Sequence, residues 1–542
     1  MALLQRLGLG RASPPPRINT LLQMISRRAE RLDAHQQAET FVSLGGIEHT
    51  LLNHDNRVIF GRRGTGKTHV MSFVADAAKK KGEMALLLDL RTIGSNSYIY
   101  TDESISLPER ATHLLRDFLS ALHDALLDQI TAPRSRHDVN RLSPLIDQLG
   151  NAVKEVIVRE SVERKHVDQG SSESTVGAEG TAKASALLGS LELKGKGEHK
   201  QTGGTSTEIV EKGHPRLSVN IGEVSRALSE VASRASTRIW VLVDEWSTLP
   251  ELLQPYLADF IKRTLFPIRN YSVQIAAIEQ RSSFREGQGT EIIGIELGSD
   301  AFADINLDDH LVFENSPQRA IAFFKEMLYR HLVAVTDNGA PARDADDFIR
   351  TAFTQASTFR ELVRACEGVP RDAINILQIA ATRAQDEKIS IPHIRDAAKD
   401  WYERDKATYV NSNTEADALL HWIVKGVIGD RKAKAFMVRS DTRNEILERL
   451  FDERILHVAK KSYSTKQEPG IRYTVWKLDY GCYVDLINTS RDPTGFLFEG
   501  LGVDDDWTLT VPEDDFRAIR RAILDLGEFS ARPPEEQTAA QA

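Results

Sequence analysis

Apolar residues along the chain fall into two patterns, short continuous runs and helical spacings. Runs at 57–60, 84–90, 239–243 and 273–278 predict buried strands, and helical spacings predict helices over 69–81, 107–131, 140–163, 221–236 and 251–265. Strands that alternate with helices are typical of a parallel sheet that is covered on both faces. We therefore predict an α/β fold, with a parallel sheet flanked by helices.

The character of the pattern changes along the chain, and the 542 residues are too many for one compact domain. After residue 316 the spacing is mostly helical, and from about 411 it becomes mixed, with helices near 415–427 and 444–452 before strands at 455–459 and 471–478. Helices followed by a two-stranded ribbon suggest a winged helix. The predicted divisions are an arm and helix (1–40), the α/β core (41–315), a helical region (316–410), a winged-helix-like domain (411–490) and a tail (491–542).

Two segments depart from the globular pattern. Residues 167–215 are rich in Gly, Ser, Thr and Lys, and two interpretations stay open: a disordered insertion, or a β-hairpin arm around 187–193 and 208–210 that contacts a partner. The tail is acidic, with 11 acidic and 4 basic residues from Glu499 to Ala542. Trp507, Leu509, Phe516, Ile519 and Ile523 suggest that part of it forms a short amphipathic helix that docks on a neighbour.

Composition excludes several classes of protein. The two cysteines, Cys366 and Cys482, cannot form a disulfide framework or a cysteine metal site, and this predicts a reducing, cytoplasmic location. The fifteen histidines show no metal-ligand spacing. No run of residues approaches 18 apolar positions, so we expect no membrane-spanning helix.

The turn after the first predicted strand carries a phosphate-binding motif. Residues 61–68 fit G-x-x-x-x-G-K-[ST] in full, with a strand before and a helix after, which is the context that this motif requires. Its glycines let consecutive N–H groups point at phosphate oxygens, and the helix N-terminus adds positive potential. We predict that Lys67 binds the β- and γ-phosphates and that Thr68 binds Mg²⁺. The predicted ATP-binding residues are Gly61, Arg62, Arg63, Gly64, Thr65, Gly66, Lys67, Thr68 and His69.

The apolar strand 239–243 ends in two carboxylates, Asp244 and Glu245. We expect this strand to lie beside the phosphate-loop strand, so that Asp244 reaches the Mg²⁺ ion. Glu245 is then placed to act as the general base that polarises the attacking water.

Further candidates follow the next strand. Glu279 and Gln280 come directly after 273–278, where a polar side chain would report the γ-phosphate, and we include Gln280 in the predicted ATP site. Arg281 and Arg285 are candidates for an arginine finger that reaches a neighbouring subunit, or they are ordinary surface charges. Gly368, Pro370 and Arg371 mark the end of one helix and the first turn of another.

Together, the phosphate loop, the Asp-Glu strand, the polar residues after the next strand and the Gly-x-Pro-Arg helix start resemble AAA+ P-loop ATPases. The origin-recognition and replication-initiator branch, in a bacterial form, is the branch that they resemble most. The resemblance covers roughly residues 40 to 490, although the insertion at 167–215 is foreign to a minimal initiator and the chain has no Ser-Arg-Phe-type finger near 305–313. It implies an ATP hydrolase in which residues 316–410 form a lid and Arg371 contacts the γ-phosphate.

The same core recurs in STAND-type signalling proteins and in antiphage systems, so two functions stay open. In one, nucleotide state controls binding of double-stranded DNA through residues 425–477, which hold 13 basic and 7 acidic residues. In the other, a slow ATPase switch acts on a protein partner, or on a second copy of the chain, through the insertion and the acidic tail.

Overall fold

The computed structural model describes residues 17–28, 31–32, 34–43, 46–94, 98–133, 138–151, 153–166, 207–287, 292–311, 316–336, 341–430, 433, 435–464, 470–484 and 522–530. Most of the predicted insertion (167–206), the acidic runs of the tail, and Arg431, Lys432, Lys434 and Lys466 lie outside these ranges. In the described part of the chain, no helix combines the length and the apolar character that a membrane span requires. Two compact units emerge, residues 153–220 and the rest of the chain.

The larger unit is built on a five-stranded sheet in which every described strand pair is parallel. Its order is β2-β5-β6-β1-β9. The predicted α/β class with a parallel sheet is thereby confirmed. The strands are β1 (Arg57–Phe60), β2 (Met84–Asp89), β5 (Ile239–Asp244), β6 (Tyr271–Ala277) and β9 (Phe302–Asn306).

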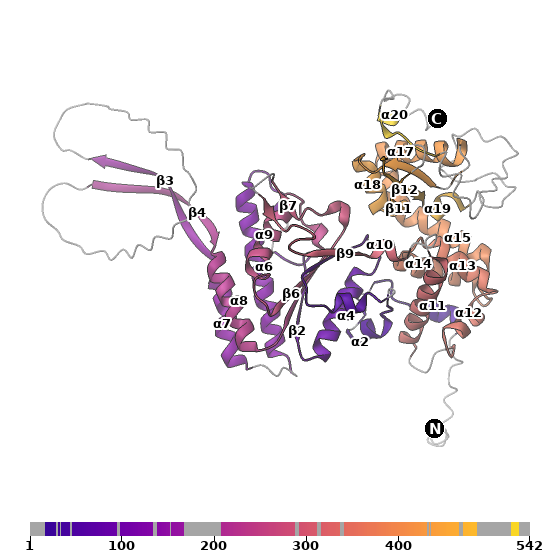
Figure 1. The fold of residues 1–542 in the computed structure, drawn as a ribbon, viewed down its shortest axis with the longest axis horizontal. Coiled ribbons are helices and arrows are strands. Elements are labelled where there is room, and N and C mark those ends of the chain that lie inside the picture. The colour runs from indigo at the N-terminus through magenta and orange to yellow at the C-terminus, as the bar shows by residue number, and fades with distance from the viewer. Residues whose placement is uncertain are drawn as a thin grey trace, which may run out of the picture. The chain divides into compact units, whose positions relative to one another are not determined.

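Helices cover both faces of this sheet because its strands are apolar on both sides. All six residues of β5 and all seven of β6 are buried. In Figure 1, α4 lies on one face, and α6 and α9 lie on the other. The helices around the sheet are α3 (Glu48–Leu51), α4 (Lys67–Lys80), α5 (Tyr98–Thr101), α6 (Leu107–Thr131), α7 (Val139–Asn151), α8 (Ile221–Ala235), α9 (Gln254–Thr264) and α10 (Leu307–His310), and a small ribbon joins β7 (Arg285–Glu286) to β8 (Ile293–Gly294).

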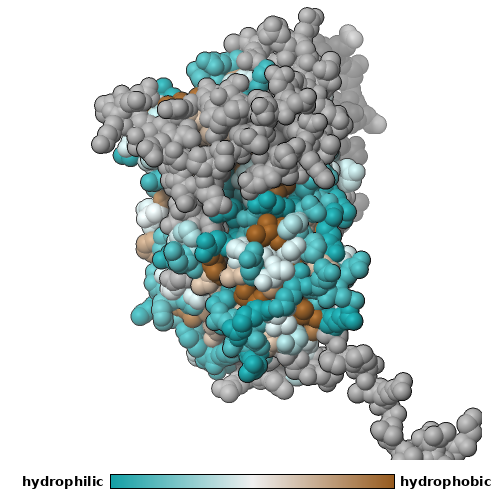
Figure 2. Space-filling model, turned by 90° about the vertical axis from the view of Figure 1, so that its right-hand side faces the viewer, coloured by the Kyte–Doolittle hydropathy of each residue, from teal (hydrophilic) through white to brown (hydrophobic). Residues whose placement is uncertain are grey.

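A helical region follows the sheet, as the spacing after residue 316 predicts. Two N-terminal helices, α1 (Ile18–Met24) and α2 (Ala34–Thr40), pack with it, α1 against α14 and α2 against α11. Figure 2 views the molecule from the side of this region, and the coloured surface there is mostly hydrophilic, with small separate hydrophobic spots. The helices are α11 (Pro317–Ala334), α12 (Ala345–Ala352), α13 (Ala356–Ala365), α14 (Pro370–Ala384), α15 (Ile391–Trp401) and α16 (Ala407–Asn411), with a π-helical turn at Tyr402–Lys406.

The region after residue 411 contains a three-stranded antiparallel sheet of order β10-β12-β11. The sequence predicted only the two strands that correspond to β11 and β12, and β10 was not predicted. We use the name C-terminal unit for residues 435–484. The region after residue 411 consists of α17 (Thr414–Val424), which precedes the C-terminal unit, and of β10 (Ala435–Arg439), α18 (Glu445–Asp452), β11 (Leu456–Tyr463), β12 (Tyr473–Leu478) and α19 (Tyr480–Tyr483) within it.

The smaller unit is an antiparallel hairpin of β3 (Val153–His166) and β4 (Thr207–Val219). The predicted helix over 140–163 is therefore wrong beyond Asn151, where α7 ends. The physical reason is the β-branched composition of the segment, since Val153, Val156, Ile157 and Val158 favour a strand over a helix. The strand pairing also begins outside the predicted limits of 167–215.

Part of the tail returns to the larger unit. Met437 of β10 exchanges backbone hydrogen bonds with Ala522 and Leu524, both at 2.9 Å, so the tail adds an edge to the sheet. The following helix, α20 (Leu526–Ser530), buries Phe529, whose ring lies 5.6 Å from that of Trp422. The amphipathic helix predicted for the tail stays a prediction, because Trp507, Leu509, Phe516 and Ile519 lie outside the described residues. Ile523, its last residue, lies in an extended segment.

We predict that Phe529→Ala destabilises this docking by about 3–5 kcal/mol, because truncating a buried aromatic leaves a cavity that the structure fills only in part. The change is read from urea unfolding of the full chain followed by tryptophan fluorescence. Glu528→Ala, which alters an exposed neighbour in the same helix, is the matched control and should leave the unfolding curve unchanged. Equal curves for both variants would contradict the docking.

Candidate functional site

The phosphate-loop motif forms the turn from β1 to α4, as predicted. Gly64 and Gly66 have φ of 87° and 99°, a region that glycine enters without steric cost. Gly61 has no room for a side chain, since an added Cβ would lie 2.5 Å from Oγ1 of Thr65. The loop conformation therefore depends on the glycines of the motif.

Lys67 begins α4, and its Nζ donates to the carbonyl oxygens of Gly61 at 2.8 Å and Arg62 at 3.0 Å. Burial lowers the pKa of Lys67, while the nearby Asp244 and Glu245 act in the opposite direction. The ammonium group is thus held over the loop in a mostly desolvated position, where it interacts strongly with any added negative charge.

The Oγ1 of Thr68 donates a hydrogen bond to Oδ2 of Asp244 at 2.6 Å. These are the two residues that were predicted to bind the same Mg²⁺ ion. The prediction that the Asp-Glu strand lies beside β1 is wrong, since β6 separates β1 from β5. The two residues still meet because α4 packs across β6, β5 and β2, which carries its first turn toward the end of β5. Paired hydroxyl and carboxylate oxygens suit a hard divalent cation such as Mg²⁺.

Glu245 follows Asp244 in a left-handed conformation, with φ of 59°, and lines the same pocket as the loop. Burial and the adjacent Asp244 raise the pKa of its carboxyl group, and Lys67 opposes this. Its Oε1 lies 3.6 Å from NH1 of Arg91, which follows β2 and forms a two-point ion pair with Asp89. Arg91 was not found from the sequence, although it follows an apolar strand just as Glu245 does.

Arg371 lies in the first turn of α14, and its backbone N–H donates to the carbonyl of Gly64 at 3.2 Å. The approach is tight, because a Cβ on Gly64 would lie 2.8 Å from Cβ of Arg371. The start of α14 therefore lies directly on the phosphate loop, and both line the same pocket.

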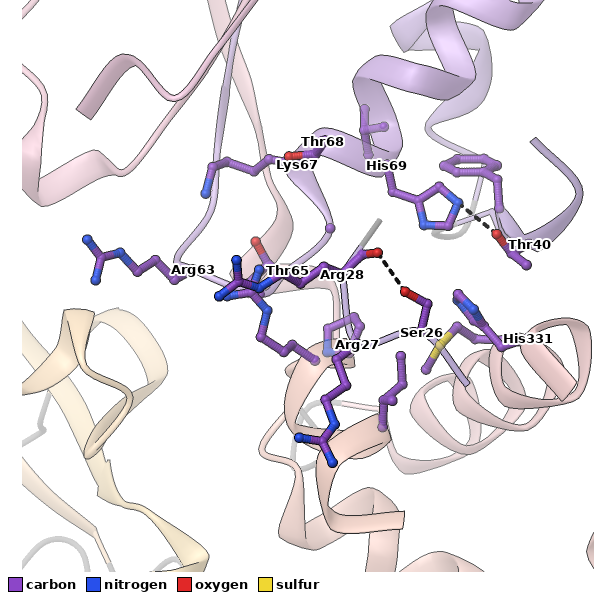
Figure 3. Close-up of a pocket in the computed structure, with 18 of the residues that line it drawn as sticks. Ser26, Arg27, Arg28, Thr40, Arg63, Thr65, Lys67, Thr68, His69 and His331 are labelled. Atoms are coloured by element: carbon purple, nitrogen blue, oxygen red, sulfur yellow. Dashed lines mark hydrogen bonds between the residues drawn. The ribbon is translucent and has the colours of Figure 1, made fainter. Parts of the chain in front are cut away.

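That pocket has a volume of about 360 Å³, which is within the range of small-ligand sites. Residues 26–28 and 40–42 of the N-terminal segment contribute to its wall, and so do α11 and α14. Figure 3 shows Ser26 and Arg28 beside the phosphate loop, whereas the side chain of Arg27 points away from α4 and donates to Gln378 of α14. No local motif in the sequence points to these residues.

His69 faces the same pocket but binds protein groups. Its Nε2 lies 2.6 Å from the carbonyl of Gln37 and 3.2 Å from Oγ1 of Thr40, so it connects α4 to α2. Its ring lies 6.0 Å from that of His331 of α11. Burial lowers the pKa of His69, and burial with the neighbouring His69 ring lowers the pKa of His331 to about 3.

Several predicted residues lie elsewhere. Arg62 turns away from the pocket, where its backbone N–H and Nε donate to Asp308 at 2.8 and 2.7 Å. Gln280 lies in the short turn after β6 and, like Gly61, is not among the described residues that line the pocket. Its neighbour Glu279 accepts from Asn306 at 2.9 Å and from Lys461 at 2.8 Å.

The two candidate arginine fingers have partners within the chain. Arg281 donates through Nε to Asp452 of α18, and its NH2 lies 3.7 Å from Glu453. Arg285 is exposed, with its NH1 3.6 Å from Oε1 of Glu296. Arg281 would have to leave a carboxylate that is 4% exposed before it could reach another subunit.

Comparisons with known proteins add little to this geometry. No protein-family model matches the chain, and none of the curated proteins matches it. Among solved structures, the ORC1 protein of Aeropyrum pernix in complex with DNA aligns with 13% identity over 85% of this chain and 93% of that one, at a TM-score of 0.28. A TM-score this low supports no argument about fold or function, so membership of the AAA+ family stays a prediction.

We predict that the free energy of unfolding decreases as the pH is lowered, because His331 is kept neutral in the folded chain. The folded chain keeps this ring neutral down to about pH 3, whereas the unfolded chain protonates it near pH 6.5. The stabilisation is therefore complete above about pH 6.5 and is lost as the pH falls, with about 2 kcal/mol lost by pH 5. Thermal unfolding of His331→Gln should show a smaller decrease between pH 7.5 and 5 than the wild type, whereas the exposed His49→Gln should match the wild type.

Proposed function

We propose that this chain binds ATP with Mg²⁺ and hydrolyses it. The observation that carries the proposal is the 2.6 Å hydrogen bond between Thr68 and Asp244, which brings two halves of a nucleotide site together across 176 residues of sequence. With Lys67 beside them and Glu245 in the same pocket, the groups that phosphate chemistry requires converge at one edge of a parallel sheet.

Different residues of the site would bind the phosphates, the metal ion and the base of ATP. The N–H groups of the loop, with Lys67, would bind the phosphates, and Arg371 would contact the terminal phosphate. Thr68 and Asp244 would hold Mg²⁺, which neutralises charge on the phosphate oxygens. Apolar residues farther along the pocket, Phe41, Met327 and Ile374 among them, provide a surface for a purine base.

Hydrolysis needs a base for the attacking water. We propose that Glu245 takes a proton from the water as its oxygen bonds to the terminal phosphorus, while the bond to the departing ADP oxygen breaks. The raised pKa of Glu245 favours this role, because a carboxylate with a higher pKa is a stronger base. Arg91 would hold the side chain of Glu245 in position.

We expect Lys67→Ala to weaken ATP binding at least tenfold, because the loop loses its buried positive charge. Glu245→Gln should bind ATP normally and lower the turnover rate by about 10²–10⁴-fold, since it removes only the base. Binding is measured with a fluorescent ATP analogue and turnover by phosphate release. Normal turnover by either variant would overturn the site assignment.

Control of double-stranded DNA binding is a second candidate function. Exposed basic residues on the C-terminal unit favour it, namely Arg443, Lys460 and Arg472. However, Arg439, Arg449, Arg454, Lys461 and Lys477 form ion pairs within the chain. The helix before the ribbon, α18, also carries Glu445, Glu448 and Asp452. Less positive charge is therefore available than the sequence count suggests, which gives weight to the alternative of a STAND-like or antiphage switch acting on a protein partner.

A salt series separates these two functions. If DNA is the partner, ATP-loaded Glu245→Gln binds duplex DNA, and log K falls linearly with log salt concentration. Lys460→Ser together with Arg472→Ser should then reduce the slope by about two, roughly one for each lost phosphate contact. No binding at low salt would rule out DNA and leave a protein as the partner of the C-terminal unit.

A further inference from the structure

Arg62 connects the phosphate loop to the C-terminal unit. Its NH1 donates to the carbonyl of Leu456 and to Nδ1 of His457, both at 3.1 Å, and its guanidinium lies 4.3 Å from the centre of the Phe451 ring. The side chain is 5% exposed. A variable position of the phosphate-loop motif is therefore buried against a part of the chain almost 400 residues away.

From His457 the contacts continue to the helical region. Because a guanidinium can only donate, Nδ1 of His457 accepts and its Nε2 donates to Asp479 at 2.9 Å. The same Asp479 oxygen accepts from Lys406 at 2.5 Å, and Lys406 lies 2.9 Å from Oδ2 of Asp372. None of these four side chains is more than 5% exposed.

From Asp372 the contacts lead back to the phosphate loop. Asp372 follows Arg371, whose backbone N–H donates to Gly64 of the phosphate loop. Arg454 of the C-terminal unit also pairs with Asp372. Polar contacts, most of them buried, and the backbone links between Arg371 and Asp372 and between Arg62 and Gly64 thus form a closed ring. The ring starts at the phosphate loop, crosses the C-terminal unit and the helical region, and ends at the phosphate loop.

Such a ring resists partial opening. Moving the C-terminal unit away from the core would break, together, the contacts that Arg62, Asp372 and Lys406 make with it, so these buried contacts are lost as a group. While the ring is closed, the loop is held in one conformation, so a ligand that binds there loses less conformational freedom.

We propose that the C-terminal unit is a clamp on the phosphate loop, so that a partner that separates this unit from the core releases the bound nucleotide. The inference rests on the proposed function, since it concerns regulation of the same site. It gives the C-terminal unit a role whatever its partner is, because the coupling runs through contacts inside the chain. By linkage, bound nucleotide also holds the unit on the core.

Hydrogen exchange on the wild-type chain tests the clamp and the proposed nucleotide binding separately. Protection of peptides from residues 61–70 on addition of ATP and Mg²⁺ reports nucleotide binding. The clamp requires slower exchange also in peptides from 453–463, of which β11 is the main part. Protection of the loop without any change in β11 would overturn the clamp and leave the proposed function standing. No protection of the loop would overturn both.

Variants supply a second test. His457→Leu removes both hydrogen bonds that this side chain makes in the ring and should weaken binding of a fluorescent ATP analogue by about 5- to 150-fold, the usual range for coupling between sites. His457→Gln keeps an acceptor for Arg62 and a donor for Asp479, so it should restore most of the affinity. Arg383→Met is the matched control, because it removes an exposed ion pair at the far end of α14. Unchanged affinity in folded His457→Leu would overturn the clamp.

Discussion

The carboxylate of Asp372 is the point on which the arrangement of the larger unit depends. Burial would raise its pKa, but Arg454 and Lys406 outweigh burial and lower the pKa to about 2. One fully buried charge thereby holds a C-terminal arginine, a lysine of the helical region and the indole N–H of Trp401 at the first turn of α14. A buried carboxylate with fewer partners would be strongly destabilising, so these elements must assemble together. The start of α14, and Arg371 with it, is therefore fixed by residues distant in sequence.

Much of the fold could be predicted because it is encoded locally. The apolar runs of β2, β5 and β6 predict a parallel sheet, and the helices between them follow from their spacing. The order of the strands could not be predicted, since it depends on how α4 packs across the sheet. The helix expected beyond Asn151 was wrong because polar and apolar residues there fit a helical spacing, whereas their β-branched side chains favour the strand β3.

In the candidate site too, the residues specified by a local motif could be predicted, whereas those placed by packing could not. Thr68 and Asp244 meet although their strands are not neighbours, and Lys67 and Glu245 line one pocket, because a motif and a strand end specify these residues. Their roles toward ATP and Mg²⁺ stay a prediction. Arg62 was assigned to the nucleotide, yet it faces the C-terminal unit, because its motif position does not specify a direction for the side chain. The contribution of residues 26–28 depends on α1 packing against α14, for which the sequence contains no signal.

The position of β1 in the sheet has a consequence for how the chain acquires its structure. Both neighbours of β1 are encoded much later, since β6 begins at Tyr271 and β9 at Phe302. Pairings between such distant segments form slowly, and until they form, the apolar strand Arg57–Phe60 stays unpaired and prone to association. A nascent chain that has reached only β5 has the complete phosphate-loop sequence and the β2–β5 pair, but neither of the strands that pair with β1. The conformation of the loop on which the proposed nucleotide binding depends is therefore reached late in folding, after residue 302 has become available.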